Sequence, residues 1–584
     1  MKDWIAGLFL FVMMLAVPLH AAPHRFALAL YHFNLQYVAG AGERNEDRVI
    51  TESFEPLLDL FLAHPEWGAD FELQGYMIEV IRDRHPGVLE KLVRLTVNGQ
   101  IDLVSFHYSD QLFLAFPRKD IEVSIEMTKE VFEEAGLPLS GVVFTQEGQF
   151  GEGMLSVMRD QGYSIGILPK NLFHHLHPGE PAGPLFTHRG VDVLIGGEGF
   201  EAQTPSGPLQ VVWTYMGDGE LLATNGADPY LGPLFREWPK AVAEYEQELA
   251  DLEAAGYEIS TISHYVDAVR ALGVLPAPLP PPLDGTWQPK DTNNVFRWMG
   301  GRGVFVWWEA DNEIRTGNML ARHTLLAAET LLAHAAEAGI DPAPFARRLE
   351  NAWRDQLFGE VSDATGWNPI RIEVEYGRSH SEAARMTAQG VIDDLLAALD
   401  LPAASIDTAT GAVTLPQDPP SCLPRAEPPI PLQVTAPGRR TKVSWCRVSG
   451  DLTYDVVTIA FGAGVQRTVS VDFPFTVDTI AYTPALLDEI VSYPRSAFGF
   501  EETGLPLANG LIEITPGRFL VKDTRRVHVA AIVGQPGTDL RFRDETLSPR
   551  KSAVWRFALI EGRENALALA KRWNETPTLT FTRP

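Results

Sequence analysis

Ionisable side chains follow three short apolar runs in the first half of the chain. His107 comes after IDLVSF, Glu147 follows VVFTQ, and Asp218 follows VVWTYMG. Glycoside hydrolysis requires two carboxyl groups, because one attacks the anomeric carbon while the other, held protonated, donates to the leaving oxygen. Glu147 and Asp218 are therefore candidates for this pair, provided that the fold brings the ends of their runs together.

Each of these residues also has a structural explanation on its own. A single histidine at a strand end more often makes a structural hydrogen bond than takes part in catalysis. A glutamate beside a glycine, as Glu147 is beside Gly148, is usually solvated. The functional interpretation gains weight because His32 follows a fourth apolar run, so four candidate strands end in polar side chains.

The elements that would position these residues alternate between strand and helix patterns over residues 23–275. ADFELQGYMIEVI reads as a strand and PGVLEKLVRLTVNG as a helix, and the same order recurs several times. Such alternation predicts a parallel sheet, and this many repeats favour closure into a barrel. In a barrel, function resides on the loops at the carboxyl ends of the strands, which is where the polar residues fall.

The pattern changes twice after the proline-rich stretch LPAPLPPPLDG. Residues 276–404 carry apolar residues at spacings of three and four, which predicts a helical domain, with Asn318 capping one of its helices. Residues 405–431 form a proline-rich linker, and residues 432–584 hold β-rich runs between turns, which predicts a β-sandwich domain. A chain of 584 residues is long enough for this division.

Charge and terminal sequence bound the partners and the location. A formal net charge of -28 argues against a nucleic-acid partner and fits a neutral substrate such as a poly- or oligosaccharide. Residues 1–22 combine a lysine, an apolar run and small residues, which is typical of a secretory signal peptide. We therefore expect a periplasmic or secreted protein with no integral membrane span after cleavage. Cys422 and Cys446 either pair in that oxidising compartment or are two unrelated thiols.

Five short motifs resemble the five regions that describe glycoside hydrolase family 57. They are His32-Phe33-Asn34, the stretch from Gly99 to His107, Gln146-Glu147-Gly148-Gln149-Phe150, Gly217-Asp218-Gly219-Glu220, and Gly285-Thr286-Trp287 with Trp298. The resemblance spans roughly residues 24–400. The first region keeps only the histidine of the usual His-Gln-Pro, which leaves the sugar open.

The resemblance implies an α/β fold, a distorted (β/α)7-type barrel followed by a helical bundle, here with a C-terminal β-sandwich. It implies a retaining hydrolase or glycosyl-transferring enzyme that acts on α-glycosidic bonds, with Glu147 as nucleophile and Asp218 as acid/base. The implied substrate-binding residues are His32, His107, Glu220, Trp287 and Trp298. Neither a metal nor another cofactor is implied, and whether water or a second sugar accepts the glycosyl group stays open.

Two other functions remain open. His174, His175 and His177 are dense enough to bind a metal, as in a polysaccharide deacetylase, but no Asp-Asp pair follows the first strand. A non-catalytic periplasmic glycan-binding or assembly protein would use the β-rich region for recognition. The presence of both Glu147 and Asp218 favours the enzyme.

Overall fold

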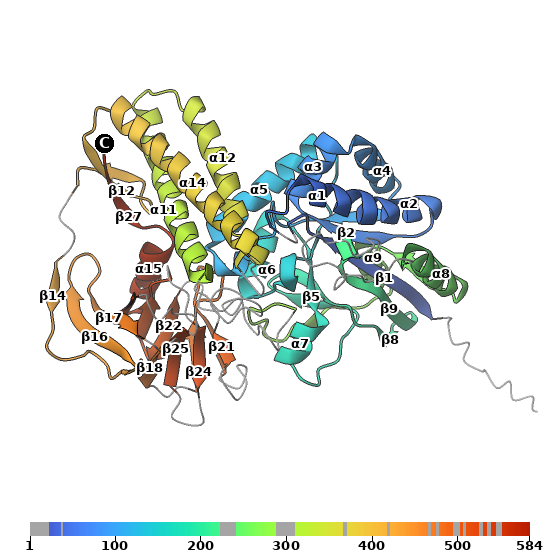
Figure 1. Ribbon diagram of the computed structural model, residues 1–584. Helices are drawn as coiled ribbons and strands as arrows, with labels where there is room; N and C mark the ends of the chain where they lie inside the picture. Colours follow the sequence, from blue (N-terminus) through green and yellow to red (C-terminus); the bar gives the residue numbers. More distant parts are fainter. Residues whose placement is uncertain are drawn as a thin grey trace, which may run out of the picture.

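The computed structural model describes most of the chain (Figure 1). The described residues are 23–36, 39–221, 241–287, 310–365, 371–416, 421–464, 469–474, 478–494, 503–505, 510–524, 529–533, 539–544 and 552–583. The predicted signal peptide, residues 1–22, and the predicted site residue Trp298 lie outside them.

Seven parallel strands form two sheets in the first part of the chain. Hydrogen bonds join the strands in the orders β3-β2-β1-β9 and β7-β5-β4. Their bounds are β1 His24–Phe33, β2 Ala69–Leu73, β3 Ile101–Val104, β4 Val142–Val143, β5 Ile165–Pro169, β7 Val191–Gly196 and β9 Gly207–Asp218. A further short parallel strand, β10 (Glu258–Ser260), pairs with the first half of β1.

The two sheets close on each other at both edges. β3 contacts β4 at one junction. At the other, Gly196 of β7 lies against Met216 of β9, because a Cβ on Gly196 would come within 2.6 Å of the Met216 sulfur. The strands therefore enclose a distorted barrel, and the predicted (β/α)7-type fold is confirmed.

Alternation along β1 decides which side chains face the barrel interior. Leu28 and Leu30 pack in an apolar cluster with residues of β3, β4, β5, β7 and β9. Tyr31 and Phe33 pack in a different cluster, with residues of the surrounding helices. His32 continues the inward series where β1 ends.

A β-bulge in β9 determines which way Asp218 points. Trp213 packs inside the barrel, whereas Tyr215 stacks on Tyr31 outside it, with ring centroids 5.2 Å apart. The register with β1 shifts between these two residues, so Thr214 is an extra residue in the strand. Because the extra residue reverses the alternation, Asp218 lies on the interior face instead of the outer one.

Helices cover the outside of the barrel (Figure 1). They include α1 Glu43–Val49, α2 Glu55–Ala63, α3 Gly75–Arg84, α4 Pro86–Val97, α5 Arg118–Glu134, α6 Glu152–Gln161, α7 Lys170–Leu176, α8 Ala241–Ala254 and α9 Ile262–Ala271. The strand predicted for ADFELQGYMIEVI is wrong in its second half, where α3 begins directly after β2. The apolar residues of that half have helical spacing and are buried on one face.

Three long helices pack together beside the barrel. They are α11 (Ala310–Glu337), α12 (Ala343–Gly359) and α14 (Arg371–Ala398), and the short α13 (Ser362–Thr365) lies between the last two. Asn318 does not cap α11, because the helix already begins at Ala310. Its buried side chain instead donates to Gly359 O at 2.7 Å. Among the described helices, none is long and apolar enough to cross a bilayer.

Two antiparallel sheets make up the β-rich region. One has the order β14-β16-β17-β26-β23-β22-β19-β20 and the other β15-β18-β25-β24-β21. Val457, Ile459, Val471 and Phe542 belong to one core cluster that both sheets share, which is the packing of a sandwich. The larger sheet consists of β14 Cys422–Pro424, β16 Arg439–Val448, β17 Tyr454–Gly464, β19 Thr479–Tyr482, β20 Val491–Pro494, β22 Leu511–Thr515, β23 Arg518–Lys522 and β26 Ala553–Glu561.

The second sheet and the ends of this region complete the fold. The second sheet consists of β15 Gln433–Thr435, β18 Val469–Pro474, β21 Thr503–Leu505, β24 Val529–Val533 and β25 Asp539–Asp544. Cys422 of β14 and Cys446 of β16 form a disulfide. After α15 (Arg563–Asn574), the last strand β27 (Thr578–Thr582) returns to pair with β12 (Ala403–Asp407), which follows the helical region. The domain boundaries at 275, 404 and 431 stay predictions.

Candidate active site

Three polar side chains lie in one row across three neighbouring strands. In the parallel register, His32 of β1 is opposite Glu72 of β2 on one side and opposite Asp218 of β9 on the other. Residues opposite each other in adjacent strands point to the same face, and the strands are about 4.8 Å apart. His32, Glu72 and Asp218 therefore project together into the barrel at the carboxyl ends of its strands.

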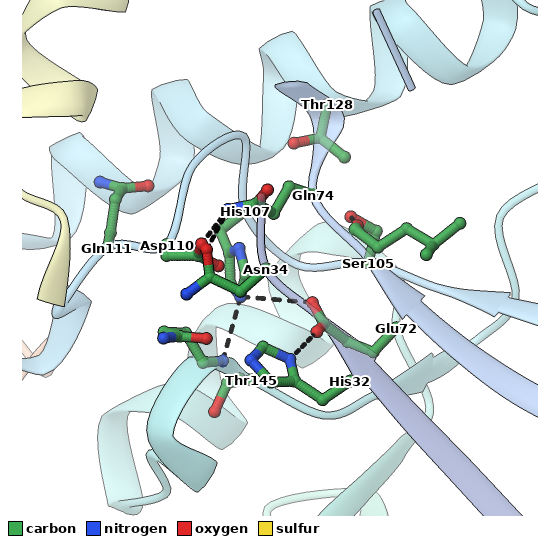
Figure 2. A network of polar contacts seen from close by, with 12 residues as sticks. His32, Asn34, Glu72, Gln74, Ser105, His107, Asp110, Gln111, Thr128 and Thr145 are labelled. Atoms are coloured by element: carbon green, nitrogen blue, oxygen red, sulfur yellow. Dashed lines mark hydrogen bonds and ion pairs between the residues drawn. The ribbon is translucent and has the colours of Figure 1, made fainter. Parts of the chain in front are cut away.

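Glu72 contacts two histidines, His32 and His107 (Figure 2). It bonds to Nδ1 of His32 through Oε2, and its Oε1 lies 3.5 Å from Nε2 of His107. Burial alone would lower the pKa of His32, but the neighbouring Glu72 carboxylate raises it well above its ordinary value. Burial lowers the pKa of His107, and the Gln146 backbone N–H donates to its Nε2 at 3.1 Å. The Glu72 charge therefore favours the imidazolium form of His32, whereas burial favours the neutral form of His107.

Glu147 occupies a tight turn, Gln146–Gly148, a few residues after the short strand β4. Its φ of 57° and ψ of 17° are left-handed values, which cost energy for a residue with a side chain. Gly148 follows with φ 53°, and its N–H donates to Thr145 O at 2.9 Å. The Glu147 side chain is only 8% exposed. The turn thus places a buried carboxyl group at the end of an inward-facing strand.

The segment from Gly285 to Trp287 holds this turn in place. Gly285 and Phe150 exchange two backbone hydrogen bonds of 3.0 Å. Trp287 donates its backbone N–H to Glu147 O and its indole N–H to Glu147 Oε2, both at 3.0 Å. A Cβ on Gly148 would come within 2.9 Å of the Trp287 Cβ, so this close approach requires glycine. One Glu147 oxygen is therefore fixed by a hydrogen-bond donor.

Several carboxyl groups surround Glu147 and raise one another's pKa. Burial raises the pKa of Glu147 well above its ordinary value, and the charges of Asp363 and Asp218 raise it further. The Trp287 hydrogen bond and the His32 charge act in the opposite direction. Burial also raises the pKa of Asp363, to about 7, and that of Glu220, in each case with support from the Asp218 charge. The cluster can therefore hold protons at neutral pH, as an acid catalyst must.

The helical region closes one side of the site. Asp363 of α13 accepts a hydrogen bond of 3.0 Å from Nδ2 of Asn34, which follows β1. Ser362 accepts from Gln146 Nε2 at 3.1 Å, and its backbone N–H donates to Asp110 O at 2.7 Å. The site is thus built from strand ends of the barrel together with one short helix far along the chain.

Six of the predicted site residues meet at this end of the barrel. They are Glu147, Asp218, His32, His107, Glu220 and Trp287. The sequence interpretation missed Glu72 and Asp363. Glu72 had a usable signal, a charged residue on the inward face of an apolar strand, whereas Asp363 lies in a polar stretch with nothing to distinguish it.

The histidine-rich stretch that suggested a metal site lies elsewhere. His174 lies in helix α7 and pairs with Glu198, and His177 follows that helix and bonds to Pro281 O at 3.1 Å. Across the part of the chain that the structure describes, no group of three or more histidine, cysteine, aspartate or glutamate residues could hold a metal ion.

The chain resembles known proteins in its fold and, over shorter stretches, in its sequence. The solved structure of an alpha-mannosidase from Enterococcus faecalis V583 aligns over 96% of this chain and 90% of that chain, with a TM-score of 0.56 and 11% identity. A glycosyl hydrolase family 38 protein from Enterococcus faecalis aligns over the same shares with a TM-score of 0.53 and 10% identity. The chain therefore has the fold of these proteins over nearly its whole length.

Sequence similarity is confined to shorter stretches. A 4-alpha-glucanotransferase of Thermococcus litoralis is 24% identical over 152 residues, 25% of this chain and 23% of that protein. Alpha-amylase 1 of Dictyoglomus thermophilum is 25% identical over 97 residues, 16% of this chain and 14% of that protein. The chain thus spans about a quarter or less of the length of these curated relatives. No family model matches it. These similarities, with the five motif regions, support a relationship of this chain to glycoside hydrolase family 57.

Proposed function

We propose that the protein is a retaining glycoside hydrolase or glycosyl-transferring enzyme acting on α-glycosidic bonds of poly- or oligosaccharides. The observation that carries the proposal is the meeting of Glu147 and Asp218 at one end of the barrel, where each influences the other's charge. The similarity to a 4-alpha-glucanotransferase and to an alpha-amylase supports α-linked glucose polymers as the first substrates to test.

In the proposed mechanism, Glu147 attacks the anomeric carbon while Asp218 protonates the leaving oxygen. The Trp287 indole N–H supports this assignment, because a donor fixed on Glu147 Oε2 stabilises the ionised form. Oε1 accepts only a long hydrogen bond of 3.5 Å from Gln146 Nε2, so it is the oxygen proposed for the attack. His32, positively charged beside Glu72, favours ionisation of Glu147 in the same way. Asp218 then takes a proton from the incoming water or sugar, which releases the product with retained configuration.

Neighbouring residues have supporting roles in this proposal. Glu220 orients the acid, since it follows Asp218 by two residues and is buried beside it. His32, His107 and Trp287 contact the sugar around the cleaved bond. Residues 1–22 are proposed to be removed on export, and N-terminal sequencing of the protein recovered from the periplasm or the medium tests this.

The test is hydrolysis of a panel of α-glucans and aryl α-glycosides by the wild type, Glu147→Gln, Asp218→Asn and the control Asp160→Asn. Asp160 is a surface carboxylate paired with Arg118, so its variant should keep full activity. We expect kcat/KM to fall by roughly 1,000-fold or more in both site variants. A wild type that binds glycans but cleaves none of them would replace the proposal with a glycan-binding protein.

A second measurement separates the two roles. Azide added to Glu147→Gly should yield a glycosyl azide of inverted configuration, because azide then replaces the nucleophile. Azide added to Asp218→Gly should yield the retained product, because it replaces the activated water in the second step. The opposite pair of products would exchange the two assignments.

A further inference from the structure

Residues 483–490, the loop between β19 and β20 of the β-sandwich, are largely buried although they form a connection. Ala485 is 0% exposed and Leu486 is 1% exposed. Both pack in a core cluster with Phe150 and Met154 of the barrel, not with the sandwich core. Connections normally run over the surface, so a loop inserted into another core needs an explanation.

The loop backbone lies directly against the first turn of α6. A Cβ on Gly153 would come within 1.8 Å of Ala485 O. Leu486 has φ 61°, a left-handed value that is unfavourable for a leucine, and it is held in this conformation inside the barrel cluster. Since α6 begins five residues after Glu147, this contact is close in sequence to the Glu147 turn.

Two buried carboxyl groups connect the loop to the barrel. Asp284 accepts a hydrogen bond of 2.8 Å from the Ala485 backbone N–H, and it immediately precedes Gly285, which pairs with Phe150. Glu152, the first residue of α6, accepts from the Tyr493 hydroxyl of β20 at 2.7 Å and from Arg189 Nε at 2.6 Å. The segment before Gly285 and the start of α6, which lie on either side of the Glu147 turn, are therefore both attached to the sandwich.

We propose that Asp284 is a positioning residue: through Ala485 it transmits the fixed position of the β19–β20 loop to the 284–287 segment and so sets the place of Glu147. The role of the β-sandwich in catalysis, on this inference, is to support the Glu147 turn, independently of any recognition of glycan by the sandwich itself. The catalytic part of the inference rests on the proposed function, whereas the positional part does not.

The protonation of Asp284 determines which substitution preserves its hydrogen bond to the loop. Burial raises its pKa to about 8, while the backbone N–H groups of Ala485 and Glu152 lower it. Below that pH the side chain is mostly neutral, so Asn has its shape and charge and keeps an oxygen for the Ala485 N–H. Asp284→Asn is therefore the conservative variant, and Asp284→Ala removes the connection.

Hydrogen exchange of the backbone amides tests the positional part without any substrate. The proposal predicts that the amides of Gly148, Phe150, Gly285 and Trp287 exchange at least tenfold faster in Asp284→Ala, and within about threefold of wild type in Asp284→Asn. The matched control is Asp455→Ala, since Asp455 is also a buried aspartate of the sandwich but bonds to Arg425 on the far edge of the larger sheet. Unchanged exchange in Asp284→Ala, or equal acceleration in Asp455→Ala, would overturn the proposal.

A second variant tests the same contact from the α6 side. Gly153→Ala favours the helix locally, so damage from it must arise where the new methyl group meets Ala485 O. We expect the same four amides to exchange faster in this variant as well. Wild-type rates there would contradict the contribution of the loop.

Kinetics then tests the catalytic part. In Asp284→Ala we expect kcat to fall at least tenfold while KM stays within about threefold, because binding residues such as His32 stay in place. Asp455→Ala should keep kcat at temperatures well below its Tm. A wild type without activity on any glycan would refute the proposed function alone, and the exchange data would still decide the positioning.

Discussion

Glu147 combines two unfavourable features in one residue. Its left-handed backbone costs on the order of 1 to 3 kcal/mol for a residue with a side chain, and its carboxyl group is buried among other acids. Such costs persist where the surroundings over-determine a conformation, as the Trp287 and Phe150 hydrogen bonds do here. We therefore expect this residue to reduce the stability of the protein, in exchange for a prepositioned carboxyl group.

The variant Glu147→Gln tests the burial cost through its pH dependence. The folded-state pKa of Glu147 is raised above its unfolded value. Ionisation of the unfolded chain therefore destabilises the wild type as pH rises above about 4.5, and the glutamine variant escapes this loss. The variant should gain on the wild type by up to about 1.4 kcal/mol per pH unit while only the unfolded carboxyl titrates. Thermal unfolding from pH 4 to pH 8 measures the difference; a gap that shrinks with rising pH contradicts the expectation.

Glu72→Gln tests the charge that this residue maintains on His32. Without the carboxylate, burial dominates and the pKa of His32 falls, so the positive charge that opposes protonation of Glu147 is lost. The acid limb of the kcat/KM profile should move to higher pH, with a loss of roughly 100-fold at pH 6. Asp102→Asn is the control, because Asp102 bonds to the Ser263 N–H of α9 instead. A uniform loss at all pH values would show that Glu72 acts through geometry alone.

Among the single residues, the strand pattern predicted those that follow apolar runs, and the family resemblance added Glu220 and Trp287. His32, His107, Glu147 and Asp218 were accessible because a strand end is visible in the pattern. Asp363 was not, since its place in the site depends on how the helical region packs against the barrel, which no local pattern encodes.

Among the elements, the bulge in β9 has the largest effect on the site. The sequence predicts the strand but not the extra residue, because Thr214 has nothing in its type to separate it from the residues around it. A regular strand would have sent Asp218 to the outer face, so the sequence named Asp218 as a candidate without any knowledge of the bulge that turns it inward. The long helices and the sandwich strands were likewise predictable from apolar periodicity, whereas α3 was missed because it follows β2 without a break.

The contact between β7 and β9 gives an element-scale prediction. In Gly196→Ala the new methyl group would lie 2.5 Å from Ile167 Cγ2 and 2.6 Å from the Met216 sulfur, so both side chains must move, and Met216 lies two residues before Asp218 in β9. We expect a loss of about 1 to 3 kcal/mol in the free energy of unfolding and a lower kcat. Gly166→Ala on β5 is the control, because its nearest neighbour would be 3.3 Å away. Equal behaviour of the two variants in denaturant unfolding and in kinetics would argue against tight closure of the barrel.

In the whole molecule, one disulfide constrains the start of the β-rich region. Cys422 and Cys446 are 24 residues apart, and the first of them lies in an exposed edge strand. Replacing both with serine should cost up to about 3.5 kcal/mol for a loop of this length, all of it in the unfolding of that region. Calorimetry of the variant and of the wild type measures this loss. The kcat should not change, and a drop in kcat would mean that the disulfide also supports the distant β19–β20 loop.

The small sheet of β12 and β27 places the two ends of the β-rich region side by side. Thr408 donates its hydroxyl to Pro577 O at 2.8 Å, so the chain enters and leaves the stretch 408–577 at neighbouring points, while the β19–β20 loop within it packs in the barrel cluster. A single genetic deletion or exchange between these two positions would remove or replace the module with only a short turn to close the gap. Such a module can be exchanged between genes as one unit. An ancestor that gained it would have acquired, in one event, the β19–β20 loop that packs against α6.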